Sequence, residues 1–96
     1  MLELRPTCEN CDAPLPPAVA DAMICSFECT FCRTCAEDVL GNICPNCGGG
    51  FQPRPIRPAE KLANYPASTT RTHKPVDLKA HAALAARLKS VAPIPR

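Results

Sequence analysis

Residues 25–47 read CSFECTFCRTCAEDVLGNICPNC, and this stretch decides the fold. Together with the upstream pair Cys8 and Cys11, it holds all eight cysteines of the chain in four close pairs. Two cysteines with two or three residues between them present both sulfurs to one tetrahedral Zn²⁺, at a zinc–sulfur distance of about 2.3 Å. Eight such ligands predict two structural zinc ions per chain.

The size of the chain makes such metals necessary. Ninety-six residues allow one small domain. The core of so small a domain gives only marginal stability unless metals or disulfides cross-link the chain. Each structural zinc contributes about 10–16 kcal/mol of apparent binding free energy, which appears as folding free energy. Disulfides are the alternative, but the close spacing fits tetrahedral ligation better than bridging.

Two local structures are expected around the later cysteine pairs. In the turn over residues 44–48, Pro45 fixes the backbone and Gly48 tolerates the left-handed region. Such a turn points backbone N–H groups at the thiolate sulfurs. Residues 34–40 read as a short helix that ends at Gly41.

A strand or hairpin is expected over residues 24–31. Phe27 and Phe31 lie in it, four residues apart. Large aromatic side chains in a small domain are most often core residues. We therefore expect both rings to fill the space between the two metals.

The order of the pairs resembles a RING finger in which every ligand is a cysteine. RING fingers are cross-braced, so the first and third pairs hold one metal and the second and fourth hold the other. The resemblance implies one zinc on Cys8, Cys11, Cys32 and Cys35 and a second zinc on Cys25, Cys29, Cys44 and Cys47. The implied fold is a small metal-stabilised α+β module with short strands and one short helix.

Two other zinc folds are alternatives. In a LIM-like sequential arrangement, Cys8, Cys11, Cys25 and Cys29 share one metal. The three residues between Cys25 and Cys29, and the short interval from Cys35 to Cys44, are unlike that family. A PHD finger has a longer interval where this chain has two residues between Cys29 and Cys32.

Longer motifs are similar to those of a family of short bacterial proteins of unknown function. The motifs are the opening MLELRP, ICSFECTFC over residues 24–32 and CPNCGG over residues 44–49. The similarity covers about residues 1–60. It implies a RING-like zinc module from a bacterium, and it implies no activity.

Charge divides the chain into an acidic head and a basic tail. Residues 1–50 contain two basic and seven acidic side chains, a net charge of −5, and residues 51–96 contain nine basic and two acidic ones, a net charge of +7. Prolines at positions 53, 55 and 58 exclude a helix after the head. We expect a two-zinc RING-like module over residues 1–52 and a proline-rich basic linker over residues 53–76.

A terminal helix is predicted over residues 77–92. Asp77 is a favourable N-cap, and the following residues are rich in Ala, Leu, Lys and Arg without Gly or Pro up to Pro93. Leu84, Leu88 and Val91 form a narrow apolar stripe on it. An isolated helix of this length is marginal in water, so we expect the stripe to pack on the head or on a partner.

These features favour a non-enzymatic protein-interaction or structural module. All eight cysteines are used as ligands, which leaves no open metal position for catalysis, and His73 and His81 lie outside every cysteine pair. A nucleic-acid-associated zinc protein that uses the basic tail, and a thiol-based zinc or redox sensor, are the alternatives. Without a signal peptide or a membrane-spanning stretch, and with clustered thiols, a cytoplasmic location is expected.

Overall fold

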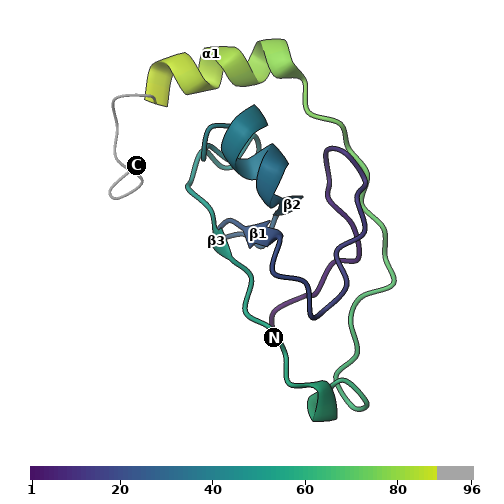
Figure 1. The fold of residues 1–96 in the computed structure, drawn as a ribbon. Helices are drawn as coiled ribbons and strands as arrows, with labels where there is room; N and C mark the ends of the chain where they lie inside the picture. Colours follow the sequence, from purple (N-terminus) through teal and green to yellow (C-terminus); the bar gives the residue numbers. More distant parts are fainter. Residues whose placement is uncertain (89–96) are drawn as a thin grey trace.

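The computed structural model of the protein describes residues 1–88, which form a three-stranded antiparallel sheet and three helical segments (Figure 1). Strand β1 (Ala22–Ile24) lies between β2 (Thr30–Cys32) and β3 (Gln52–Pro53). Ile24 pairs with Thr30 across the β1–β2 hairpin, which confirms the hairpin that the sequence predicted. Pro53 lies on an edge strand, where its missing N–H removes no central hydrogen bond.

Helix η1 (Cys35–Val39) follows β2 with only two residues between them. The N–H of Leu40 donates to Cys35 O over 2.8 Å, so the last turn is wider than an α-helical turn. Gly41 and Asn42 then take left-handed φ angles of 58° and 62°. The predicted short helix and its end at Gly41 are confirmed.

The core lies around the sheet and η1. The rings of Phe31 and Phe51 meet edge to face, with centroids 5.4 Å apart. Other large apolar side chains buried there are Leu4, Leu15, Met23, Leu40 and Ile43. The expectation that Phe27 also fills the core is wrong. Phe27 is 71% exposed, and it lies beside the exposed Ser26 in the turn between β1 and β2.

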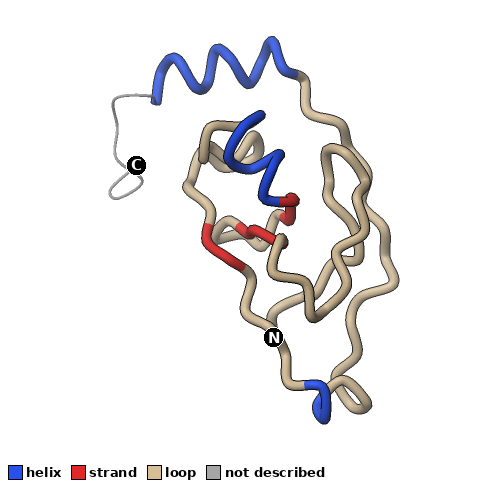
Figure 2. The backbone as a smooth tube through the Cα atoms, viewed as in Figure 1, coloured by secondary structure: helices blue, strands red, loops and turns tan. Residues whose placement is uncertain are grey.

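The second half of the chain runs back over the head. After β3 it leads to the short helix η2 (Ala59–Lys61), at the end of the molecule opposite the terminal helix, and then returns past the N-terminal segment (Figures 1 and 2). Arg57 Nη2 donates to Leu2 O over 2.7 Å, and Ser68 N donates to Leu4 O over 3.0 Å. The proline-rich segment is therefore packed along the N-terminus.

Arg54 is the polar centre of this packing. Arg54 is 4% exposed, and its guanidinium donates to the backbone oxygens of Arg5, Leu15 and Pro16 at 2.9–3.2 Å. Burial lowers the pKa of Arg54. Three carbonyl partners compensate the buried guanidinium, which ties the segment after β3 to the loop before β1.

The terminal helix α1 (Leu78–Leu88) begins as predicted. Asp77 Oδ1 accepts the N–H groups of Lys79 and Ala80 at 3.1 Å each, which is an N-cap. Residues 89–92 of the predicted helix, and Val91 of its apolar stripe, lie outside the described residues. No helix in the described range has the length and apolarity that crossing a membrane requires.

Candidate metal centre

The structure brings together the sulfurs of the first and third cysteine pairs. The Sγ atoms of Cys8, Cys11, Cys32 and Cys35 all lie within 4.8 Å of one another. Those of Cys11 and Cys32 are 3.7 Å apart, although the residues are 21 positions apart in sequence. A tetrahedral site with metal–sulfur distances of about 2.3 Å has sulfur–sulfur edges of about 3.8 Å. The first cluster therefore has nearly the geometry that a tetrahedral metal requires.

A second cluster combines residues of the second and fourth pairs. The Sγ atoms of Cys25, Cys44 and Cys47 lie within 4.8 Å of one another. Cys29 does not meet that criterion with all three, but its Sγ accepts a hydrogen bond from Asn46 Nδ2 over 3.4 Å. Because Asn46 lies between Cys44 and Cys47, Cys29 borders this cluster. Each cluster thus joins pairs that are not neighbours in sequence, which is a cross-braced arrangement.

The first pair lies in a tight turn, here called the first knuckle (residues 8–13). The N–H of Cys8 donates to Ala13 O over 2.9 Å, and the N–H of Asp12 donates back to Cys8 O over 2.9 Å. Asp12 takes a φ of 65°, which is tolerated better by Asp than by most side chains. These bonds fold the turn so that Cys8 and Cys11 face one point.

The fourth pair lies in a turn of the same form, here called the fourth knuckle (residues 44–49). The N–H of Cys44 donates to Gly49 O, and the N–H of Gly48 donates to Cys44 O, at 2.8 Å each. Gly48 takes a φ of 79°, as the sequence predicted. Each cluster therefore contains one knuckle, and the two knuckles have the same pattern of backbone hydrogen bonds.

Backbone N–H groups point at sulfur atoms in both clusters. Cys8 Sγ accepts from Cys11 N at 3.5 Å, Cys25 Sγ from Phe27 N at 3.3 Å and Cys47 Sγ from Gly49 N at 3.4 Å. Such donors offset the negative charge of metal-bound thiolates. The bond to Cys47 confirms the expected orientation of N–H groups in the fourth knuckle.

Two asparagines occupy matching positions in the two knuckles. Asn10 Nδ2 donates to Cys35 Sγ, and Asn46 Nδ2 donates to Cys29 Sγ, at 3.4 Å each. In both cases the acceptor belongs to the other cysteine pair at the same cluster and is the second cysteine of that pair. Sequence reasoning missed this role. The signal was available, because Cys-x-Asn-Cys occurs at residues 8–11 and again at residues 44–47.

Burial controls the acidity of the metal-free thiols. Desolvation raises the pKa of four of them, namely Cys29, Cys32, Cys35 and Cys44. For Cys8 desolvation acts in the same direction, but N–H donors that include Cys11 N outweigh it and lower its pKa. A soft divalent metal must therefore displace protons that several of these thiols hold firmly.

Comparison with known proteins places the chain in a family. The family described as "Protein of unknown function (DUF1272)" matches residues 1–57, which contain both clusters. The chain belongs to this family. An uncharacterised protein of Rhizobium meliloti (strain 1021) is 64% identical to it over 75 residues, which are 78% of this chain and 89% of that protein. No solved structure matches the chain. The resemblance to a bacterial family of unknown function is thereby confirmed.

A buried carboxylate positions the first knuckle of this DUF1272 chain. Glu9 is 4% exposed, and its Oε2 accepts from Arg5 Nη1 at 2.7 Å and from Thr30 N at 2.8 Å. Glu9 N also donates to Thr30 O over 3.0 Å. Thr30 begins β2, which ends at Cys32, so Glu9 sets the position of the first cysteine pair relative to the third.

Neither histidine is a member of the two cysteine clusters. His73 is exposed, and His81 is buried on the inner side of α1. His81 Nε2 donates to Ile43 O over 2.9 Å. Neither histidine belongs to a potential metal-binding group among residues 1–88. His81 instead attaches α1 to the residue just before the fourth knuckle.

Proposed function

We propose that this DUF1272 protein is a two-zinc structural module that presents a rigid surface to another protein in the cytoplasm. One zinc is held by Cys8, Cys11, Cys32 and Cys35, and the other by Cys25, Cys29, Cys44 and Cys47. The observation that carries the proposal is the 3.7 Å contact between Cys11 Sγ and Cys32 Sγ, because it matches the edge of a zinc–thiolate tetrahedron and joins distant pairs.

Zinc is favoured by the donor set. Four thiolates around one point suit Zn²⁺ or an iron–sulfur centre, and harder cations prefer oxygen ligands. The N–H groups that point at sulfur support bound thiolates over free thiols. When bound, the zinc ions supply folding free energy, and the cysteines and their N–H donors determine where the knuckles lie.

Cys29 is assigned to the second zinc because of the symmetry between the knuckles. Asn46 donates to Cys29 in the same way that Asn10 donates to Cys35. Cys35 already belongs to a complete group of four sulfurs. A small movement of the Cys29 side chain toward the other three sulfurs would complete the second group.

A binding role without catalysis fits a closed pair of sites. Four cysteines on each metal leave no position for a substrate or a reactive water. The tail is less available to nucleic acid than its charge indicates, because Arg54 and Arg57 bind backbone oxygens of the head and Arg71 pairs with Asp12. A cytoplasmic location is favoured because reduced thiols are stable there.

The proposal is tested by metal analysis together with partner capture. Protein purified without chelator should contain two zincs per chain and unfold when they are removed. Cys29→Ser should weaken one of the two zincs, and Ser26→Ala, in the exposed turn between β1 and β2, should weaken neither. Affinity capture with intact protein from its native cell should recover a protein partner that the Cys44→Ser variant does not. Recovery of nucleic acid alone, or one zinc per chain, would contradict the proposal.

A further inference from the structure

The C-terminal strap, defined as residues 71–88, is attached to the first knuckle. Three contacts join it to that turn: Arg71 with the carboxylate of Asp12, Lys74 N with Glu9 O at 2.8 Å, and Val76 N with Asn10 Oδ1 at 2.9 Å. One of these partners is an asparagine side chain that also contacts a cysteine sulfur. The strap therefore reaches the edge of the first metal cluster.

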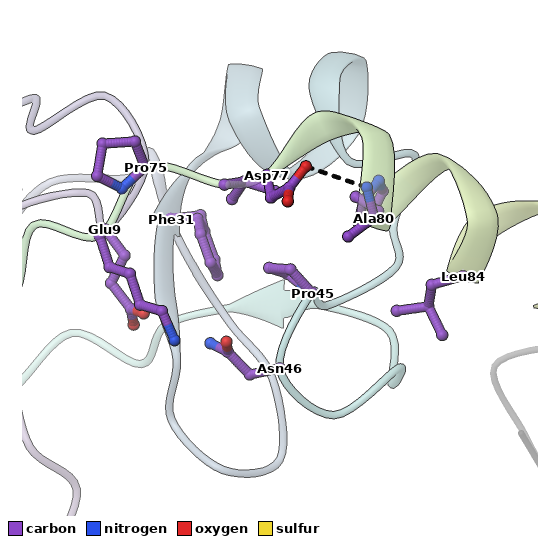
Figure 3. A pocket seen from close by; sticks show the side chains of 11 residues that line it. Glu9, Phe31, Pro45, Asn46, Pro75, Asp77, Ala80 and Leu84 are labelled. Atoms are coloured by element: carbon purple, nitrogen blue, oxygen red, sulfur yellow. Dashed lines mark hydrogen bonds between the residues drawn. The ribbon is translucent and has the colours of Figure 1, made fainter.

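The helical part of the strap lies on the fourth knuckle. His81 Nε2 bonds Ile43 O. Leu88 Cδ1 is 3.1 Å from where a Cβ on Gly48 would be, so a larger residue at position 48 would press against the helix. Leu84 lies on the side of α1 that faces Pro45 (Figure 3). The strap thus spans two turns that belong to different metal clusters.

The strap lies over a groove in the head, and α1 only partly fills this groove. A cavity of about 330 Å³ remains between the head and the strap. It is lined on the head by Glu9, Phe31 and Pro45 and on the strap by Val76, Ala80 and Leu84. Figure 3 shows Pro45 between Phe31 and the helix, with Glu9 at one end of the groove and Leu84 at the other. The groove has apolar walls and a carbonyl, that of Ile43, which accepts a hydrogen bond. It already holds α1, whose charged side chains Lys79 and Arg87 are both cationic, so a cationic amphipathic helix is the occupant that suits it.

Asn10 contacts the metal cluster and the strap with opposite ends of one amide. Its Nδ2 donates to Cys35 Sγ at 3.4 Å, and its Oδ1 accepts from Val76 N at 2.9 Å. A metal-bound thiolate accepts hydrogen bonds and donates none, so it fixes the Nδ2 end toward the sulfur. The Oδ1 end must then face Val76. Loss of the metal removes the charge that selects this orientation.

We propose that the groove between the first and fourth knuckles is a binding surface for a cationic amphipathic helix, covered by the chain's own α1, and that Asn10 couples this cover to the metal of the first cluster. The inference rests on the proposed two-zinc function and adds its regulation. With the first metal bound, α1 occupies the groove. When the strap detaches from the metal-loaded head, a helix of similar chemistry binds in its place.

The coupling works in both directions. If the metal strengthens attachment of the strap, attachment of the strap strengthens retention of the metal by the same factor. A change on the strap that touches neither cluster must therefore speed metal release. Val76→Pro is such a change, because it deletes the N–H that Asn10 accepts and keeps an apolar side chain.

The first experiment measures amide exchange across α1 in the full-length, zinc-loaded protein. Asn10→Ala and Val76→Pro should speed exchange of residues 78–88 by about tenfold, since each removes one anchoring hydrogen bond. Asn64→Ala is the control, because Asn64 is exposed and lies outside the groove. Its α1 should exchange as in the unmodified protein. Equal exchange in all four proteins, or equal acceleration by Asn64→Ala, would overturn the coupling.

The second experiment uses a fluorescent synthetic peptide with the sequence of residues 71–88. It should bind the Val76→Pro protein about tenfold more tightly than the unmodified protein, whose own strap competes. A Val76→Pro protein with a mobile α1 and no peptide binding would show that the groove is not a helix-binding surface. Release of one of the two zincs to a chelator should also be faster in Val76→Pro, and unchanged release would refute the link to the metal. Zinc content is measured on the same samples, so a protein without two zincs contradicts the proposed function and not the coupling.

Discussion

Asn10 and Asn46 are equivalent residues of two turns, and each donates its side-chain amide to a cysteine sulfur at 3.4 Å. The acceptors, Cys35 and Cys29, come from two different pairs. This symmetry relates the two clusters although their cysteines alternate along the chain. It supports our proposal that Cys29 joins Cys25, Cys44 and Cys47 in the second group.

The first prediction concerns Asn46. Asn46→Leu keeps the approximate size of the side chain and removes the N–H donor to Cys29. Outer-shell partners of this kind are worth about 10–100-fold in metal affinity, so one of the two zincs should bind that much more weakly in chelator competition. Asn64→Leu, at an exposed position after η2, is the control and should change neither affinity. Unchanged binding in Asn46→Leu would show that the contact with Cys29 has no role in ligation.

The second prediction concerns Arg54. Arg54→Met retains most of the apolar stem but removes the guanidinium that donates to the backbone oxygens of Arg5 and Leu15. The free energy of unfolding should fall by about 2–4 kcal/mol, as measured by denaturant titration at constant zinc. Lys61→Met, which changes an exposed cation on η2, should have little effect. A loss below about 0.5 kcal/mol in Arg54→Met would contradict a structural role for the guanidinium.

The third prediction compares two glycines with left-handed backbone. Gly41 and Gly48 have φ angles of 58° and 79°, so alanine at either position should cost about 1 kcal/mol of stability through backbone strain. Only at Gly48 does an added Cβ meet another element, Leu88 of α1, whereas Gly41 has nothing within 4 Å. Faster amide exchange in α1 should therefore appear in Gly48→Ala and not in Gly41→Ala. The same exchange rates in both variants would show that α1 does not rest on the fourth knuckle.

The fourth prediction separates cross-braced from sequential ligation. A peptide of residues 1–30 contains Cys8, Cys11, Cys25 and Cys29, which do not form one complete site in the cross-brace. It should bind zinc weakly and without a fixed stoichiometry in a competition titration. One tightly bound, tetrahedral zinc per peptide would support the sequential arrangement instead.

The metal-binding turns were predictable from the sequence because their chemistry is local. Close cysteine pairs, Pro45 and Gly48 determine turns within a few residues, and the short helix ends at Gly41 for the same reason. The exposure of Phe27 was not predictable from its residue type, because it depends on where the turn between β1 and β2 lies in the fold. Burial of Arg54 and attachment of the strap depend on contacts across 38–66 positions of sequence. Periodicity and spacing carry no information on such contacts.

The central claim is that two metals are each held by four cysteines from non-adjacent pairs. Cadmium-113 replaces zinc in thiolate sites and has a nuclear spin, so NMR can connect each metal to the β protons of its own cysteines. The cross-brace predicts two cadmium signals, one coupled to Cys8, Cys11, Cys32 and Cys35 and the other to Cys25, Cys29, Cys44 and Cys47. A cadmium signal coupled to Cys8, Cys11, Cys25 and Cys29, or a single signal per chain, would contradict it.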